Sequence, residues 1–361
     1  KHGIKLVLGY TVEGFKEKDN GVEVLLKDNP SLQADMVVLA IGVTPDTALA
    51  KEAGLELGIK GSIVVNDRME TSVPDIYAAG DAVQVKHYVT GDDALISLAG
   101  PANKQGRIIA DNICGGDSRY LGSQGSSVIK VFDMTAATTG INETNAKKSG
   151  LEVDTVILSP MSHAGYYPGG KVMTMKVVFE KETYRLLGAQ IIGYEGVDKR
   201  IDVLATAIHA GLKATQLKDL DLAYAPPYSS AKDPVNMAGF MIDNIAKGTL
   251  KQWHLEDMDK ISRDKSVVLL DVRTVGEFNR GHMDGFKNIP VDELRERINE
   301  IEKGKPVYLI CQSGLRSYIA SRILEGNGYE TYNFSGGFRF YDAVVNDRAL
   351  IERAYACGMD Y

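Results

Sequence analysis

The sequence predicts a multidomain α/β protein, and three observations support this fold class. The chain has 361 residues, more than one hydrophobic core usually organises. Short β-like segments separated by turn residues occupy residues 5–8, 12–15, 21–26 and 36–41. Strand-like and helix-like patterns alternate through later parts of the chain, which is typical of α/β domains.

Composition and charge exclude several classes of function. The chain is 44% hydrophobic and 25% charged, as in ordinary globular proteins. Its net charge of -7, with no basic cluster, argues against a nucleic-acid partner. The longest apolar run, residues 36–43, is too short to span a bilayer, and the opening residues lack the pattern of a signal peptide. We therefore expect a cytoplasmic protein with no membrane partner.

Three cysteines occur, Cys114, Cys311 and Cys357. An odd number cannot form a closed disulphide framework and fits a reducing compartment, so each is considered as a thiol. The six histidines are scattered and no C-x-x-C occurs, so we expect no metal site.

The middle of the chain predicts a strand followed by a helix. An apolar run over residues 76–80 ends at Gly80, and a helix is expected over residues 101–113. The Gly- and Ser-rich residues 115–127 predict a linker. Further elements are expected beyond it: strands over residues 128–133, 155–159 and 172–179, and helices over residues 199–211 and 233–247.

Two local patterns sharpen these predictions. The alternation within residues 172–179 predicts a strand with one solvated face. Asp233 followed by Pro234 predicts a helix N-cap with proline at the first helical position. After a domain boundary near Leu250, a second α/β unit is expected, with strands over residues 267–271, 307–311 and 331–334 and a helix over residues 317–326.

Residues 71–81, TSVPDIYAAGD, end in a Gly-Asp pair. Glycine lets the backbone approach a ligand closely, and the carboxylate of Asp81 can accept hydrogen bonds from hydroxyl groups. The segment resembles the second flavin-binding motif of the pyridine nucleotide-disulphide oxidoreductases. This resemblance implies that Gly80 and Asp81 contact FAD, with Asp81 at its ribityl hydroxyls.

Residues 98–107, LAGPANKQGR, place a proline at the start of the expected helix. The free N–H groups and the positive dipole end of such a helix can face an anion. In the family this helix end faces the flavin ring, so the resemblance adds Leu98, Ala99 and Pro101 to the FAD-binding residues. An ordinary helix opened by proline is the alternative.

Residues 40–45, AIGVTP, resemble the end of the family's NAD domain, which implies that Gly42 lies beside the nicotinamide of NADH or NADPH. No G-x-G-x-x-G fingerprint occurs in the sequence, although the family uses one for FAD and one for NAD. We therefore expect roughly two hundred N-terminal residues of the family pattern to be absent, together with its redox-active cysteine.

Two tyrosine-rich clusters occupy residues 162–169, SHAGYYPG, and 223–230, AYAPPYSS. They lie in a stretch that resembles the family's dimerisation domain. Tyr, Pro and Ser stand where glutathione-type reductases have a His-Glu pair, and this departure resembles the coenzyme A-disulphide reductases. The resemblance implies a homodimer in which Tyr166 and Tyr224 approach the partner's redox cysteine and a coenzyme A substrate.

Phenol groups suit this role because they can donate a hydrogen bond or a proton to a thiolate without adding charge. The alternative is that these tyrosines are amphipathic interface residues, of which the chain has many. Tyr228 is the next candidate for the catalytic role. Possible phosphate contacts are Lys171, Lys199 and Arg200.

The last part of the chain contains the segments LLDVR at 269–273, EF at 277–278, GHMDG at 281–285 and CQSGLRS at 311–317. This set resembles a rhodanese domain. Cys311 ends a buried strand just before a helix, so backbone N–H groups can converge on its sulfur and hold a persulfide. The expected substrate loop follows the nucleophile Cys311 and consists of Gln312, Ser313, Gly314, Leu315, Arg316 and Ser317.

Loop length favours sulfur over phosphate. Four residues separate Cys311 from Arg316, whereas the related dual-specificity phosphatases use C-x5-R. Asp271 and Arg273 are expected to hold the fold beneath the loop as a buried ion pair, and His282 to do so by hydrogen bonding. Cys114 and Cys357 are expected to be structural or incidental.

These observations predict four segments: residues 1–70 from an NAD(P)-binding domain, 71–119 from a FAD-binding domain, 120–249 as an α+β dimerisation domain and 250–361 as a rhodanese-like α/β domain. The nucleotide-binding parts are expected to be partial three-layer domains. The hypothesis is a FAD-dependent NAD(P)H reductase of small-molecule sulfur substrates, namely persulfides, polysulfides or coenzyme A disulphide, in which Cys311 handles sulfane sulfur. Two alternatives remain: an NADH oxidase with an independent thiosulfate sulfurtransferase, and a module that senses sulfane sulfur.

Overall fold

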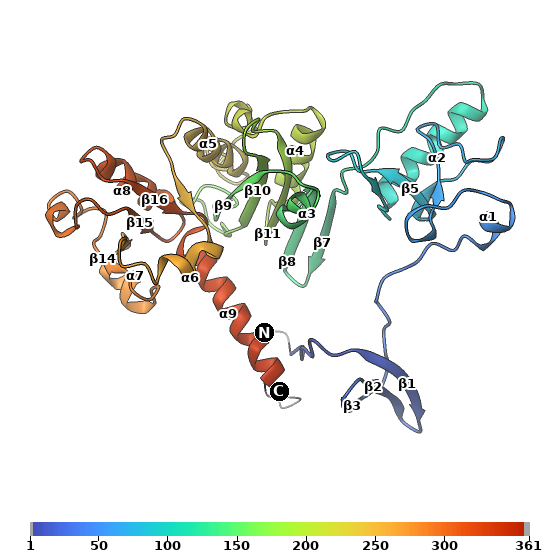
Figure 1. Cartoon of the computed structure of the whole chain (residues 1–361), viewed down its shortest axis with the longest axis horizontal. Helices are drawn as coiled ribbons and strands as arrows, with labels where there is room; N and C mark the ends of the chain where they lie inside the picture. The colour runs from blue at the N-terminus through green and yellow to red at the C-terminus, as the bar shows by residue number, and fades with distance from the viewer. Residues whose placement is uncertain (1–2, 357–361) are drawn as a thin grey trace. The chain divides into compact units, whose positions relative to one another are not determined.

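The computed structural model describes the backbone of residues 3–356 and the side chains of residues 3–347 (Figure 1). Cys357, for which a structural or incidental role is expected, lies outside the described residues. The chain divides into two compact units, one covering residues 44–340 and the other holding the described residues before and after it. Within the described residues, no helix is long and apolar enough to cross a membrane.

The unit that holds the first residues contains a three-stranded antiparallel sheet in the order β1-β2-β3. Its strands are β1 (Val12–Lys18), β2 (Gly21–Leu26) and β3 (Asn29–Ala34). Gly21 has φ of +140°, and a Cβ there would lie 2.4 Å from the carbonyl oxygen of Ala34. This tight turn therefore requires glycine.

Two strands expected in this region are absent from the structure. Residues 5–8 and 36–41 have no strand pairing, and large apolar side chains there, such as Met36 and Ile41, are exposed. A strand needs a neighbour to accept its backbone hydrogen bonds, and no described segment pairs with either stretch. The prediction of these two strands is therefore wrong for the described chain.

Residues 44–125 form a small α/β region around the sheet β4-β5-β6. Its elements are α1 (Ala48–Glu52), η1 (Ile59–Gly61), β4 (Ile63–Val64), η2 (Gly80–Ala82), β5 (Val83–Lys86), β6 (Asp93–Ala94) and α2 (Ala99–Ile113). Met69, Val83 and Val85 form its buried core, and Ile108 of α2 packs on them. The prediction that a strand ends at Gly80 is wrong: the strand begins after Asp81, because Val83 and Val85 are the side chains that reach the core.

A five-stranded antiparallel sheet in the order β7-β8-β11-β10-β9 follows. Its strands are β7 (Ser127–Val131), β8 (Met134–Gly140), β9 (Val153–Leu158), β10 (Thr174–Glu180) and β11 (Leu186–Gly193). The helices of this region are α3 (Glu143–Lys148), α4 (Val197–His209), η3 (Ala214–Asp219) and α5 (Pro234–Ala246). Helix α4 lies against β8 and β11, and α5 contacts η3 and β9 (Figure 1).

The predicted solvated face of β10 is only partly present. Val177, Val178 and Phe179 are all buried, so the alternation stops in the second half of the strand. The pairing with β11 shifts between Val178 and Phe179, and such a bulge places consecutive side chains toward covered surfaces.

Helix α5 begins where the sequence predicts it. Asp233 is the N-cap and accepts a hydrogen bond from the backbone N–H of Val235, and Pro234 is the first helical residue. Asn236 returns the interaction to the backbone N–H of Asp233, which completes a capping box. This fixed start positions Asp233 for the buried network described below.

The last region has a five-stranded parallel sheet in the order β12-β16-β15-β13-β14. Its strands are β12 (Gln252–Trp253), β13 (Val268–Asp271), β14 (Lys287–Asn288), β15 (Val307–Ile310) and β16 (Thr331–Phe334). Its helices are η4 (Leu255–Asp257), α6 (Met258–Ile261), α7 (Val275–Arg280), η5 (Ile298–Glu300), α8 (Leu315–Glu325) and α9 (Gly337–Ala356). The predicted α/β class is confirmed by these sheets and helices.

The close packing of α5 on η3 generates a test of the fold. A Cβ at Gly239 of α5 would lie 2.2 Å from the backbone nitrogen of Lys218, so we expect Gly239→Ala to lower the free energy of unfolding by about 1–3 kcal/mol. Gly106 in α2 has open space around it, and Gly106→Ala should instead raise that free energy by about 0.5–1 kcal/mol. Thermal unfolding followed by circular dichroism measures both. Equal stability of the two variants would contradict the packing.

Candidate functional site

Cys311 lies between the end of β15 at Ile310 and the start of α8 at Leu315. Its side chain is 1% exposed. The sulfur accepts a hydrogen bond from the backbone N–H of Gly314 at 3.1 Å and from the hydroxyl of Ser317 at 3.2 Å. Two donors therefore converge on one sulfur, an arrangement that stabilises negative charge there.

The loop is short because its glycine adopts a backbone conformation that other residues avoid. Gly314 has φ of +99° and serves as the N-cap of α8. Its carbonyl accepts a hydrogen bond from Asn333 Nδ2 and lies 3.1 Å from Ser317 Oγ, whose single hydrogen is shared between this carbonyl and the Cys311 sulfur. Ser313 and Leu315 are exposed, and Gln312 and Arg316 are partly buried.

Beneath the loop, Asp271 and Arg273 form a buried ion pair, in line with the expected structural role. The guanidinium Nη2 lies 2.7 Å from Asp271 Oδ2 and donates to the carbonyl of Gly281 at 2.7 Å. The central guanidinium carbon of Arg273, Cζ, lies 3.8 Å from the centre of the Phe338 ring, and Nη1 lies 3.5 Å from Gln312 Oε1. The carbonyl of Phe278 accepts a hydrogen bond from His282 Nδ1 at 3.0 Å.

The first turn of α9 supports the loop in a way that the sequence analysis missed. The backbone N–H of Phe338 donates to the carbonyl of Cys311 at 2.8 Å, and that of Arg339 donates to the carbonyl of Gln312 at 3.2 Å. Gly337 has φ of +69°, and a Cβ there would lie 2.7 Å from the oxygen of Gln312. The Gly336-Gly337 pair, which one residue separates from the end of β16, was the available signal, because glycine lets the backbone approach closely.

Arg316 forms a two-point ion pair that the sequence analysis also missed. Its Nη1 and Nη2 lie 2.7 Å from the two carboxylate oxygens of Glu277. Glu277 additionally accepts hydrogen bonds from the backbone N–H and hydroxyl of Thr274, which caps α7. The hydrogen bonds from Arg316 lower the pKa of Glu277 to about 2, so this carboxylate is charged at neutral pH.

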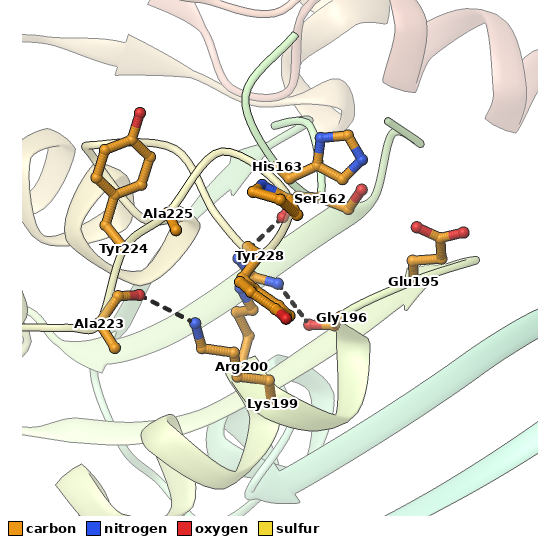
Figure 2. Close-up of a pocket in the computed structure, with 11 residues that line it drawn as sticks. Ser162, His163, Glu195, Gly196, Lys199, Arg200, Ala223, Tyr224, Ala225 and Tyr228 are labelled. Carbon is orange, nitrogen blue, oxygen red and sulfur yellow. Dashed lines mark hydrogen bonds between the residues drawn. The ribbon is translucent and has the colours of Figure 1, made fainter. Parts of the chain in front are cut away.

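A second site is a cavity of about 440 Å³ next to the tyrosine clusters (Figure 2). Both clusters contribute to its walls, together with residues at the start of α4. The lining residues are Ser162, His163, Glu195, Gly196, Lys199, Arg200, Ala223, Tyr224, Ala225, Pro227 and Tyr228. The structure thus brings together segments that are about sixty residues apart in the sequence.

Arg200 links the two tyrosine-rich clusters through hydrogen bonds to both. Its side chain is 1% exposed and lies 2.9 Å from Asp233 Oδ2. It also donates to the carbonyls of Ser162 and Tyr228 and to the hydroxyl of Ser229, as Figure 2 shows in part. Because these groups already occupy its donors, the geometry favours a structural role for Arg200 over the possible phosphate contact.

The two candidate tyrosines contact each other. The hydroxyl oxygens of Tyr166 and Tyr224 are 2.8 Å apart, and both side chains are exposed. This hydrogen bond raises the pKa of Tyr224 above its usual value. Tyr166 does not line the cavity, whereas Tyr228 does.

The candidate lysines differ in their surroundings. Lys199 points into the cavity region with Nζ 3.4 Å from the carbonyl of Ala223, and it is 3.9 Å from Asp233 Oδ2 (Figure 2). Lys171 is exposed, and its backbone N–H donates to the hydroxyl of Ser162. Lys199 is therefore the lysine that adds positive charge to this cavity.

The segment expected to contact FAD has free polar groups. Gly80 has φ of +86° with open space where a Cβ would be, and its N–H donates to Gln105 Oε1 at 2.7 Å. The carboxylate of Asp81 is exposed and forms no hydrogen bond or ion pair with the described residues. An open glycine beside an unpaired carboxylate fits a ligand that carries hydroxyl groups.

Helix α2 has a similarly open start. Leu98 is its N-cap, Ala99 is its first residue, and no side chain caps its first turn. The free N–H groups near Pro101 fit an electron-rich ring edge. Gln105, which ties this helix to Gly80, was missed because a buried glutamine in a helix has no distinctive sequence pattern. Gly42 has φ of +97° and open surroundings.

The Glu277–Arg316 pair generates a prediction about pH. The carboxyl of Glu277 titrates near 4.5 when the chain is unfolded and near 2 when it is folded, so the pair stabilises the fold above pH 4.5. This contribution is lost as the pH falls from 4.5 towards 2. We expect the stability of Glu277→Gln to change less over this range than that of the parent. Urea unfolding followed by fluorescence of Trp253, the chain's one tryptophan, reports on this domain.

The matched control is Glu296→Gln, which replaces an exposed carboxylate of the same domain. Its pH profile should follow that of the parent. A Glu277→Gln profile as steep as the parent profile between pH 4.5 and pH 2 would show that the pair does not lower the pKa of Glu277.

Family models match three parts of the chain. Residues 1–106 match the pyridine nucleotide-disulphide oxidoreductase model, residues 126–234 match the dimerisation domain of the same family, and residues 254–343 match the rhodanese-like domain. The NAD(P)H sulfur oxidoreductase (CoA-dependent) of Pyrococcus abyssi is 38% identical over 235 residues, which cover 65% of this chain and 52% of that protein.

Two solved structures are similar over most of the chain. Reduced Bacillus anthracis CoADR-RHD matches with a TM-score of 0.90 and 46% identity, over 94% of this chain and 60% of that chain. An NAD-dependent persulfide reductase from A. fulgidus matches with a TM-score of 0.82 and 40% identity, over 92% of this chain and 61% of that chain.

The chain spans about half the length of the curated relatives that it matches. The matched segments nevertheless contain every strand of the described sheets except β12, which ends one residue before the rhodanese-like match begins. The chain therefore belongs to the pyridine nucleotide-disulphide oxidoreductase family and carries a rhodanese-like domain over residues 254–343.

Proposed function

We propose that this chain is part of a FAD-dependent NAD(P)H reductase of persulfides, polysulfides or coenzyme A disulphide, in which Cys311 handles sulfane sulfur. The observation that carries the proposal is the sulfur of Cys311, which accepts two hydrogen bonds in a loop anchored by a buried ion pair. The similarity to a CoA-dependent sulfur oxidoreductase and to a persulfide reductase supports it.

The proposal assigns one role to each segment of the chain. Residues 1–70 belong to the NAD(P)-binding part, 71–119 to the FAD-binding part, 120–249 to the dimerisation domain and 250–361 to the rhodanese domain. A homodimer follows from the dimerisation domain and from the exposure of Tyr166 and Tyr224, which leaves their hydroxyls accessible to a partner subunit.

At the rhodanese site, the thiolate of Cys311 attacks the outer sulfur of a sulfane donor. The donor's S–S bond breaks, its electron pair leaves with the donor fragment, and Cys311 becomes a persulfide. Gly314 N–H and Ser317 Oγ stabilise the charge on the Cys311 sulfur before the attack. The Cys311 side chain is 1% exposed, which limits the access of water to that sulfur.

On the reductase side, bound FAD would supply two-electron transfer from NAD(P)H to a sulfur acceptor. Within this chain Gly80, Asp81, Leu98, Ala99 and Pro101 would hold it, and Gly42 would lie beside the nicotinamide. The hydroxyl of Tyr224 lies 2.8 Å from that of Tyr166, and as a phenol it can donate a hydrogen bond or a proton to a thiolate leaving group. Coenzyme A is the proposed carrier of the leaving thiol.

A second candidate is an independent sulfurtransferase beside an NADH oxidase. One observation favours it: the groups that surround the Cys311 sulfur and support its loop all come from residues 271–339. Such a site can transfer sulfur without the flavin. NAD(P)H oxidation that stops when oxygen is removed, resumes when air is admitted and needs no sulfur compound as acceptor would favour this candidate.

One prediction from this proposal concerns the nucleophile Cys311. In the complete flavoprotein that contains this chain, Cys311→Ser should lower sulfane-sulfur transfer to cyanide by about a thousandfold, because serine lacks the thiolate. Anaerobic NAD(P)H oxidation with coenzyme A persulfide should also fall, whereas flavin reduction by NAD(P)H should not. Cys114→Ser, at an exposed cysteine, is the matched control and should leave both rates unchanged. Unchanged turnover of every persulfide donor in Cys311→Ser would refute the proposal.

Another prediction from this proposal concerns the hydrogen-bonded pair Tyr166 and Tyr224. Tyr224→Phe should lower the anaerobic rate of coenzyme A disulphide reduction by about tenfold to a hundredfold, since the proton donor is removed. Tyr166→Phe should have a smaller effect, and the double variant should be less impaired than the product of both effects, because the two hydroxyls act as one unit. Tyr194→Phe, at another exposed tyrosine, is the control. Multiplicative effects in the double variant would show that the two phenols act separately.

A further inference from the structure

The guanidinium groups at the Cys311 loop are both matched by carboxylates. Arg273, which lies beneath Gln312, is paired with Asp271, and Arg316 within the loop is paired with Glu277. Each pair is net neutral. The loop therefore offers hydrogen-bond donors to the sulfur. The guanidinium groups of Arg273 and Arg316 contribute little excess positive charge there, because each is paired with a carboxylate.

The Glu277–Arg316 pair is held in place rather than formed by chance at the surface. Both terminal nitrogens of Arg316 bond to separate oxygens of Glu277 at 2.7 Å. The same carboxylate is fixed by the N-terminal cap of α7 through Thr274. Two-point Arg–carboxylate pairs have defined geometry, so Arg316 is not free to turn towards a second anion without losing Glu277.

The charge of the sulfur donor determines how strongly an unpaired cation near the loop would affect its reaction with Cys311. Thiosulfate is a dianion, and its reaction with the Cys311 thiolate gathers three negative charges before sulfite leaves with the electron pair of the broken S–S bond. An organic persulfide carries at most one negative charge, and a thiolate leaves instead. In both reactions Cys311 gains the outer sulfur. An unmatched cation near the loop therefore favours thiosulfate far more than it favours a persulfide.

The side chains next to this ion pair add apolar surface. Leu315 precedes Arg316 and is 66% exposed, and Val275 lies two residues before Glu277 and is 52% exposed. Ile319, one turn further along α8, is also exposed. Exposed apolar side chains beside a neutral ion pair suit the organic part of a thiol carrier better than a small inorganic dianion.

We propose that Glu277 is a specificity-determining residue of the rhodanese site, which by matching Arg316 selects organic persulfides over thiosulfate as sulfur donors. This inference rests on the proposed function, because it deepens the assignment of Cys311 as the sulfur acceptor. Glu277 acts through Arg316 and does not contact the sulfur.

The test compares two donors, thiosulfate and glutathione persulfide, with cyanide as the acceptor, in the complete flavoprotein. Cyanide removes the outer sulfur from Cys311 as thiocyanate and returns the thiolate. We expect Glu277→Gln to raise kcat/KM for thiosulfate about tenfold, mainly through a lower KM, and to change that for glutathione persulfide less than about twofold. The gain should shrink as ionic strength rises, because it depends on an exposed charge.

Two further variants separate charge from position. Glu277→Asp keeps the charge and should retain the donor preference of the parent. The double variant Glu277→Gln/Arg316→Gln removes both charges, so its preference should also return towards that of the parent, and it leaves no unpaired guanidinium to unsettle folding. Glu300→Gln removes one of the two carboxylate partners of Arg297 in the same domain and should leave kcat/KM for both donors unchanged.

Several outcomes would overturn the inference. An equal fall in kcat/KM for both donors in Glu277→Gln, with Trp253 fluorescence of a folded domain, would mean that Glu277 only positions Arg316. The same donor switch in Glu277→Asp as in Glu277→Gln would show that charge is not the determinant. Equal transfer from both donors in the parent and in Cys311→Ser would overturn both the inference and the proposed function, whereas the first two outcomes leave the function of Cys311 intact.

Discussion

The buried ion pair between Asp271 and Arg273 is the interaction on which the rhodanese site depends. It joins the end of β13 to the carbonyl of Gly281 after α7, and its guanidinium supports Gln312 and the ring of Phe338. Removing one member would leave a buried charge without a partner, at a cost of about 3–5 kcal/mol. The Cys311 loop would then lose the contacts that support it from the buried side, and the Gly314 N–H and Ser317 hydroxyl would no longer be held towards the sulfur.

The tyrosine pocket, like the rhodanese site, is supported by a buried Arg–Asp ion pair. Arg200, buried beside Asp233, bonds to backbone and side-chain oxygens from both tyrosine clusters, so one guanidinium fixes two loops relative to α4 and α5. Each site therefore has a buried ion pair beneath the residues that would carry its chemistry. A buried charge tolerates few alternative arrangements, and this limits the loops to one geometry.

The two sites differ in how they treat charge. The Cys311 loop lies beside neutral ion pairs and offers hydrogen bonds, whereas the tyrosine pocket adds the cation of Lys199 and the phenol of Tyr224. A persulfide suits the first environment and a thiolate leaving group suits the second. This contrast is consistent with a division of labour in which sulfur is accepted at Cys311 and thiolates are released near the tyrosines.

The sequence alone determined the features that depend on neighbouring residues: the cap at Asp233, the strand over Thr331–Phe334, and the position of Cys311 between a strand and a helix. These follow from local hydrogen bonds and from hydrophobic periodicity. Only the tertiary structure decided which distant groups meet, as for Glu277 and Arg316, or Gly80 and Gln105. It also decided against the expected strand over residues 36–41, because a strand forms only where another segment supplies the partners for its backbone.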